Sequence, residues 1–225
     1  MAAPVFDAAS NASGSGAGPF TFSHTTSGSD RVMWIGISYY HPSVTISAVT
    51  YNAVAATLVP LASADNGDYH ARLYYLIAPA TGSNTVSVSV SGSVYSIGVG
   101  VTTVTGAHQT TPYGTAVNAT GNDSTPTVDV LAAGDEIAID TLCVIHSGTL
   151  SVGSGQTSRW NAITSNGFIK YAASTEPGAG TTTMSWSNTT AQNWALVAVA
   201  IKPVAAGGGS TVPVFVHHLR QQGIA

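Results

Sequence analysis

The stretch Asn84–Gly92, NTVSVSVSG, decides the fold class of this chain. Val86, Val88 and Val90 alternate with serines, which is the period-two pattern of a β-strand with one face in a core and the other in water. The stretch Asp135–His146, DEIAIDTLCVIH, repeats the alternation with isoleucine and cysteine. Both segments therefore predict strands that each present one face to a hydrophobic core.

Similar segments recur along nearly the whole chain, separated by clusters of Gly, Asn, Ser and Pro, and none carries a helical stripe. The NGD turn at Asn66–Asp68 predicts a hairpin, because Asn-Gly tolerates positive φ. Many short strands with such turns are typical of an all-β fold, a two-sheet antiparallel β-sandwich that is jelly-roll-like. Its two sheets would share a core that contains Trp34, Tyr74, Leu76, Val99 and Trp194.

The length of 225 residues fits one large β domain or two small ones. The last strand-like segment ends at Lys202–Pro203, and the run Gly207–Ser210 then has the composition of a flexible linker. We therefore predict a β-sandwich domain over 1–204 and a Gly-linked C-terminal arm over 205–225.

Charged residues make up only 7% of the chain, and its six Lys and Arg residues are scattered. This excludes a dense basic footprint for duplex nucleic acid or for an anionic membrane. The N-terminal segment has neither the positive region nor the apolar region of a secretory signal, and no apolar stretch is long enough to span a bilayer. A β-rich chain of this composition without an export signal predicts a particle that is assembled in the cytoplasm and released by lysis.

The sequence contains no recognisable catalytic motif. Ser154 lies in SVGSGQ, which lacks the first glycine of a nucleophile elbow, and we expect a loop there. Gly98 and Gly100 have no third glycine for a dinucleotide site, and they predict a bend in a strand. Cys143 lies in an apolar run and is expected to be a buried thiol. We therefore predict a protein that is not an enzyme and needs no cofactor.

Metal binding is not expected either. The turns at Asp65–Asp68 and around Asp123 offer oxygen atoms, but they lack the spaced carboxylates of a calcium loop. His217 and His218 are adjacent, so on a strand their side chains point to opposite faces. We interpret the acidic turns as solvated and predict no metal site.

Two further kinds of site remain open. Glycoside hydrolysis needs a pair of carboxylates, and Asp129, Asp140 and Glu176 are the candidates, although nothing in the sequence pairs them. Carbohydrate binding needs exposed aromatic rings. Aromatic residues in alternating strands more often face inward, but five of them are possible glycan contacts: Tyr39, Tyr40, Tyr113, Trp160 and Trp186. We take Tyr39, Tyr40 and Trp160 as the candidates.

The C-terminal arm carries an apolar strand pattern of its own. Ordering the eight residues 212–219 costs on the order of 8 to 12 kcal/mol of backbone entropy, and burying each large apolar side chain returns about 2 kcal/mol. The entropy cost and the gain from burial nearly cancel, so a single arm is predicted to bind its partner weakly. Binding becomes stable where many copies act together. Pro213 favours addition to the edge of a partner sheet. The alternatives are an arm that covers an edge of its own domain and a tail without function. The predicted partner contacts are Val212, Val214, Phe215, Val216, Leu219 and Arg220.

Several phrases along the chain resemble a known module: FDAAS, TYNAVAATLV, LYYLIAPATGSNTVSVSVSG, TGAHQTTPYGTAVNATGNDSTPTVDV and STEPGAGTTTMSWSNTTAQNWALVAVAIKP. Together they make the span from Val5 to Pro203 similar to a β-sandwich module of tailed-bacteriophage virion proteins and of some bacterial surface proteins. This chain has His108 where the QTTP phrase would be expected to carry an acidic residue. An ion-binding role for that position is therefore not carried over.

The resemblance implies a virion structural protein without catalytic residues. The leading expectation is a capsid decoration (cement) protein on the outer surface of the head, made in the host cytoplasm. Its partners would be the major capsid protein or other virion subunits, it would form homo-oligomers, and it would bind neither nucleic acid nor membrane. The alternative is a tail, fibre or surface module that binds host glycans.

Overall fold

The computed structural model describes residues 2–205, in which the chain forms seventeen β-strands and no α-helix. Within these residues there is accordingly no helix that is long and apolar enough to cross a membrane. The predicted arm contacts from Val212 to Arg220 lie outside the described residues. The all-β antiparallel architecture expected from the sequence is confirmed.

The first half of the chain folds into one sandwich of two sheets. Its large sheet has the strand order β1-β9-β3-β7-β6, and its small sheet has the order β2-β8-β4-β5. The strands are β1 (Val5–Gly16), β2 (Phe20–Thr26), β3 (Val32–Tyr40), β4 (Ile46–Tyr51), β5 (Val54–Ala55), β6 (Thr57–Asn66), β7 (Tyr69–Ile77), β8 (Gly82–Val90) and β9 (Val94–Thr105).

The second half folds into another sandwich with a matching order. Its large sheet is β10-β17-β12-β15-β14, and its small sheet is β11-β16-β13. The strands are β10 (Val117–Asp123), β11 (Thr127–Ala132), β12 (Ile137–Ile145), β13 (Leu150–Val152), β14 (Thr157–Ile163), β15 (Ile169–Pro177), β16 (Gly180–Asn188) and β17 (Gln192–Ile201).

The strand pairing within each half is nested. In the first half β1 pairs with β9, β2 with β8, β3 with β7 and β4 with β5. In the second half β10 pairs with β17, β11 with β16 and β12 with β15. First-with-last pairing of this kind arises when one long antiparallel hairpin is rolled up into two sheets, which is the jelly-roll arrangement. The chain therefore contains two jelly rolls in succession.

The repeat is also visible in the sequence once the structure is known. Residues 79–103 and residues 177–201 align without a gap and cover corresponding strands. Gly82 and Gly180, which begin β8 and β16, both have positive φ values, of 84° and 92°. The two segments share the alternating pattern far more than they share residues, so the duplication was missed in the sequence alone.

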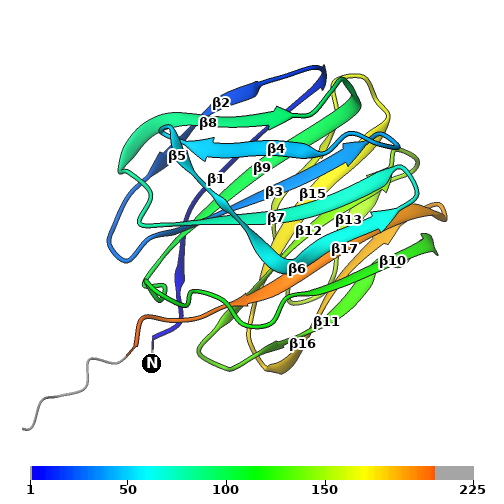
Figure 1. Ribbon diagram of the computed structural model, residues 1–225. Helices are drawn as coiled ribbons and strands as arrows, with labels where there is room; N and C mark the ends of the chain where they lie inside the picture. Colours follow the sequence, from blue (N-terminus) through cyan, green and yellow to red (C-terminus); the bar gives the residue numbers. More distant parts are fainter. Residues whose placement is uncertain (1, 206–225) are drawn as a thin grey trace, which may run out of the picture.

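The four sheets stack as layers, with the two large sheets facing each other in the middle. Figure 1 shows the small sheet with β2, β8 and β4 at the top and the strands β11 and β16 at the bottom. Each jelly roll has its own internal core, and a further cluster lies between the large sheets. The expected single shared core is therefore wrong: Trp34 lies between the jelly rolls, Tyr74, Leu76 and Val99 belong to the first, and Trp194 belongs to the second.

This stacking explains where the alternation rule holds. In β8, which belongs to an outer sheet, Val86 and Val88 are buried and the serines beside them are not, as the sequence predicted. In β12, a central strand, every residue from Ala138 to Val144 is buried, including Asp140 and Thr141. The outward face predicted for this strand is instead covered, because each large sheet has a neighbour on both faces.

The two large sheets approach closely where glycines replace side chains. Gly36 of β3 and Gly100 of β9 lie opposite each other, and the indole of Trp160 from β14 packs over both. Gly98 faces the ring of Tyr171 in the same way, and the Tyr171 hydroxyl donates to Asn11 Oδ1 at 2.8 Å. β9 keeps its register with β1 and β3 through both glycines. The glycines provide space for aromatic rings.

Changing Gly100 to alanine should lower the free energy of unfolding by roughly 1 to 3 kcal/mol, because the added Cβ would overlap the buried indole of Trp160. Chemical denaturation measures the change. Gly114 is the matched control, since a Cβ there would meet Ala200 Cβ at an ordinary 3.7 Å. Equal effects at the two positions would contradict this account of the interface.

Candidate functional site

The described chain begins and ends at the same end of the molecule, which we call the proximal end. Val5 pairs with Thr105, and Pro203 forms a bridge with Ala107. β3 and β9 connect this end to the opposite one, about 35 Å away for a strand of this length. We call the opposite end the distal end, and define it by Tyr40, His41, Tyr69, Tyr95 and Phe168.

Aromatic rings gather at the distal end around Tyr40. The Tyr40 ring stacks on Tyr69, with centroids 4.8 Å apart and an angle of 7° between the planes. Tyr95 lies 5.3 Å from Tyr40 and Phe168 lies 6.0 Å from it. The His41 ring contacts Tyr95 at 4.5 Å. Tyr95 and Phe168 are 49% and 54% exposed, so this cluster presents aromatic surface to solvent.

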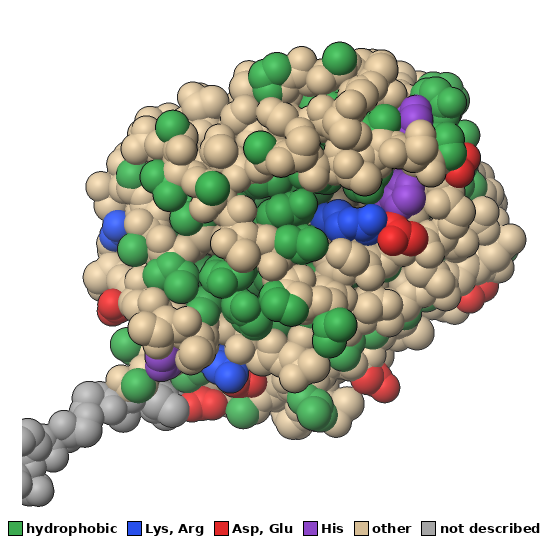
Figure 2. Space-filling view, viewed as in Figure 1, with side chains coloured by type: hydrophobic (Ala, Val, Ile, Leu, Met, Phe, Trp, Pro, Cys, Tyr) green, Lys and Arg blue, Asp and Glu red, His purple; other side chains and the backbone are tan. Residues whose placement is uncertain are grey.

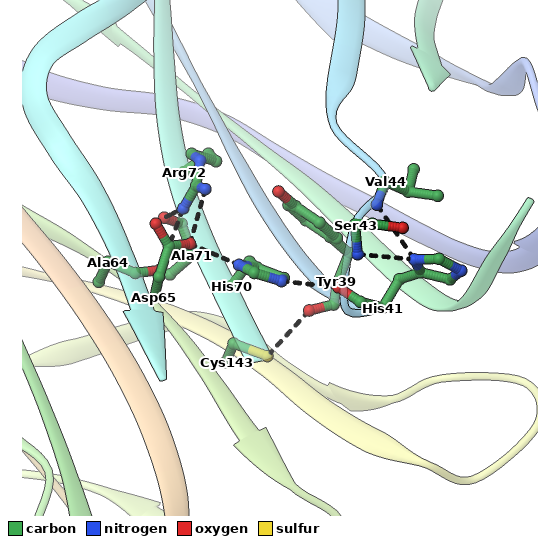
Figure 3. Close-up of polar contacts among 10 residues, drawn as sticks. All are labelled: Tyr39, His41, Ser43, Val44, Ala64, Asp65, His70, Ala71, Arg72 and Cys143. Atoms are coloured by element: carbon green, nitrogen blue, oxygen red, sulfur yellow. Dashed lines mark hydrogen bonds and ion pairs between the residues drawn. The ribbon is translucent and has the colours of Figure 1, made fainter. Parts of the chain in front are cut away.

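A polar network supports the loop that carries His41 (Figure 3). His70 contacts the carboxylate of Asp65 through Nδ1 and the carbonyl oxygen of His41 through Nε2, the latter at 2.8 Å. The His70 ring therefore connects the Asp65 side chain to the backbone of the His41 loop. The His41 Nδ1 in turn accepts from the backbone N–H groups of Ser43 and Val44 at 3.1 and 3.0 Å. The loop is thus held from both sides.

Arg72 completes this network. Its Nη2 donates to Asp65 Oδ1 at 2.6 Å, and its Nη1 donates to the carbonyl oxygens of Ala64 and Ala71. Partial burial alone would raise the pKa of Asp65, but the bonds from His70 and Arg72 outweigh it and lower the pKa below its ordinary value. The ring of Tyr39 stacks on His70 at 4.4 Å and lies 5.7 Å from the Arg72 guanidinium.

The Asp65–His70 pair has the orientation of two members of a catalytic triad, but a backbone carbonyl occupies the place of the nucleophile. The nearby thiol of Cys143 donates to Tyr39 O at 3.8 Å, and burial raises its pKa to about 12. A thiol in that environment stays protonated, as expected for a buried core cysteine. The geometry therefore suits positioning of the His41 loop.

The three candidate carboxylates do not form an accessible pair. Asp140 is fully buried, where it accepts from the Ser174 backbone N–H at 2.5 Å and from Trp186 Nε1 at 2.7 Å. Asp129 instead accepts from the Thr183 hydroxyl on the surface of the small sheet. Burial raises the pKa of Glu176, and one of its oxygens is buried without a described hydrogen-bond partner.

Two of the three predicted glycan contacts are wrong in position. Tyr39 is 1% exposed and Trp160 is 5% exposed, so neither ring can stack on a ligand. Tyr40 is partly exposed at the centre of the distal cluster. The sequence reasoning missed Tyr95 and Phe168. Tyr95 follows the turn segment SGSV, and Phe168 follows the turn segment TSNG. An aromatic residue directly after such a turn, at the start of a strand, is the signal that could have identified them.

The remaining predicted sites have ordinary structural surroundings. Asp65 bonds to cations of the chain itself, and Asp123 accepts from Thr125 N and from Trp194 Nε1. Ser154 lies in the turn between β13 and β14, as predicted. Among residues 2–205 there is no group of three or more potential metal-ligating side chains. His217 and His218 lie outside the described residues.

Asp140 should make the stability of the chain depend on pH. Burial raises the pKa of Asp140 from 3.8 to about 7. The protonated side chain therefore contributes its full share to the free energy of unfolding below pH 3.8, and this share is lost as the pH rises through 7. The stability advantage of the native chain over the Asp140→Asn variant should therefore shrink by on the order of 2 kcal/mol between pH 5 and pH 8. Urea unfolding of both proteins at each pH measures it.

Burial lowers the pKa of His24 to about 4, so His24 changes the stability with pH in the opposite direction to Asp140. His24 is present in both proteins, and its contribution therefore cancels when their stabilities are compared. A difference in stability that stays constant with pH would show that Asp140 does not titrate in this range.

The chain was also compared with known proteins. No family model, no curated protein and no solved structure matches it. The resemblance to a virion module therefore stays a prediction from the sequence.

Proposed function

We propose that this protein is a structural subunit of a virus particle, a decoration (cement) protein on the outer capsid surface of a tailed bacteriophage. The observation that supports this most is the direct packing of two jelly rolls through their large sheets into one body. Jelly rolls are a common architecture of viral capsid proteins and of lectins. A body with a core on both faces of its central strands resists deformation, which is what a protein that stiffens a shell requires.

The surface supports the same proposal. Figure 2 shows a face that is mainly tan, with a continuous hydrophobic area near its centre and only a few charged side chains, some of them beside a side chain of opposite charge. With only 7% charged residues, the surface consists mainly of hydroxyl, amide and glycine groups. Such a surface forms neutral, hydrogen-bonded contacts with neighbouring subunits and offers little to nucleic acid.

The described chain ends distinguish the two ends of the molecule, because both lie at the proximal end. Residue 205 is the last described residue, and Pro203 is bridged to Ala107 at the proximal end. The predicted arm, 205–225, begins there. We infer that the proximal end faces the capsid, where the arm contacts the major capsid protein or a neighbouring copy, and that the distal end faces outward. A tail or fibre location would use the same orientation.

Binding to particles tests this function. Full-length protein is added to purified particles assembled without it, and occupancy is measured by co-sedimentation and located by cryo-electron microscopy. Full-length protein should saturate at a fixed number of copies on the outer surface, because each copy fills a repeated site. Failure of the full-length chain to co-sediment would overturn the proposal.

Removal of residues 206–225 tests the role of the arm separately. The truncated chain should keep the melting temperature of the full-length protein, and its occupancy on particles should fall at least about tenfold, because a weak clamp adds most once the body is already docked. A full-length variant with Phe215→Ser and Leu219→Ser is the control for chain length, and it should show the same loss. Unchanged occupancy of both variants would rule out the arm as a clamp.

A further inference from the structure

We propose that the distal end binds an uncharged carbohydrate, with Tyr95 and Phe168 as the stacking surface and His41 as a hydrogen-bond donor. This activity goes beyond a role in particle structure and does not depend on it. The two exposed rings come from different jelly rolls, Tyr95 from the start of β9 and Phe168 from the turn before β15. Both contact Tyr40, whose ring is inclined by 57° to that of Tyr95 and by 45° to that of Phe168, so the aromatic platform is an angled surface and not one plane.

The platform is held in place by hydrogen bonds between the two jelly rolls. Asn166 donates from Nδ2 to the carbonyl oxygen of Tyr95 at 2.5 Å, and its Oδ1 lies 2.8 Å from the Ser96 hydroxyl. The Ser96 hydroxyl also lies 2.7 Å from Thr164 Oγ1. The carbonyl oxygen of Phe168 accepts from the backbone N–H of His146. A surface that is already ordered loses little conformational entropy when a ligand binds.

His41 is a hydrogen-bond donor with free capacity at the distal end. Because His41 Nδ1 accepts two backbone N–H bonds, the ring hydrogen of the neutral imidazole lies on Nε2, which has no described partner. The exposed residues Ser91, Ser93 and Ser165 beside the rings add hydroxyl groups, whereas Thr164 is buried. Aromatic faces edged by neutral donors and acceptors match a pyranose ring, which has an apolar C–H face and a rim of hydroxyl groups.

The charges around the platform favour an uncharged ligand. The five residues that define the distal end include no Lys, Arg, Asp or Glu. Asp65 and Arg72 neutralise each other nearby, and the ammonium group of Lys170 donates to the Gly148 carbonyl oxygen. Asp68, next to Tyr69, would repel an acidic polysaccharide. The exposed rings stand among hydroxyl and amide groups, whereas a protein interface of standard size buries about 800 Å² on each partner around an apolar centre.

Saturation-transfer NMR on the full-length chain tests the proposal with stated probes: maltohexaose, cellohexaose, mannohexaose and, as the acidic comparison, hexagalacturonate. At least one neutral hexasaccharide should bind, and the acidic one should bind at least about tenfold more weakly. Tyr95→Ala and Phe168→Ala should each weaken binding at least about tenfold. Because both side chains are about half exposed, the melting temperature should change little.

Leu131→Ala is the matched control, since Leu131 is a 74% exposed apolar side chain of β11, away from the distal end. Its binding should equal that of the unchanged protein. The proposal is overturned by absence of binding to all three neutral probes, by preference for the acidic probe, or by binding that survives both substitutions. Sedimentation in which Tyr95→Ala abolishes self-association would overturn it too, because the platform would then contact a second copy.

Discussion

The packing of aromatic rings from one large sheet onto glycines of the other is the contact on which the rest of this structure depends. Trp160 lies over Gly36 and Gly100, and Tyr171 lies over Gly98. Two sheets normally stack about 10 Å apart with side chains from both filling the space. Here one sheet supplies the rings and the other supplies the room for them, so the large sheets meet without a gap. The apolar cluster around Trp34 continues this contact towards the opposite edge.

Joining two jelly rolls in this way changes the chemistry of the central strands. A strand such as β12 is covered on both faces, so a polar side chain on it can find partners only inside the protein, and the hydroxyl of Thr141 is buried without a described one. Asp140 finds partners in Ser174 and Trp186. His70 finds them in Asp65 and the carbonyl oxygen of His41. These bonds connect loops and strands that are far apart in the sequence.

The distal end exists only because the jelly rolls are joined. Tyr40 and Tyr95 belong to the first and Phe168 to the second, and the bonds of Asn166 to Tyr95 and Ser96 tie the turn of one half to the strand of the other. The first jelly roll supplies four of the five residues that define this end, and the second adds the exposed ring of Phe168. The described ends of the chain meet at the proximal end, so the proposed attachment site and the proposed carbohydrate site lie at opposite ends of the strands. This separation makes a role on a particle surface compatible with ligand binding at the far end.

The sequence by itself determined the class of fold and the character of the surface. Alternation at Val86 and Val88 is a local property of a strand with one wet face, and the scarcity of charge follows directly from composition. The pattern could not determine that the chain forms two sandwiches, because the halves share alternation more than residues. Nor could it place Tyr39 and Trp160 in the interior while Tyr95 and Phe168 reach solvent. Those positions depend on which faces of the large sheets are covered, and that is decided only when residues about a hundred positions apart pack against each other.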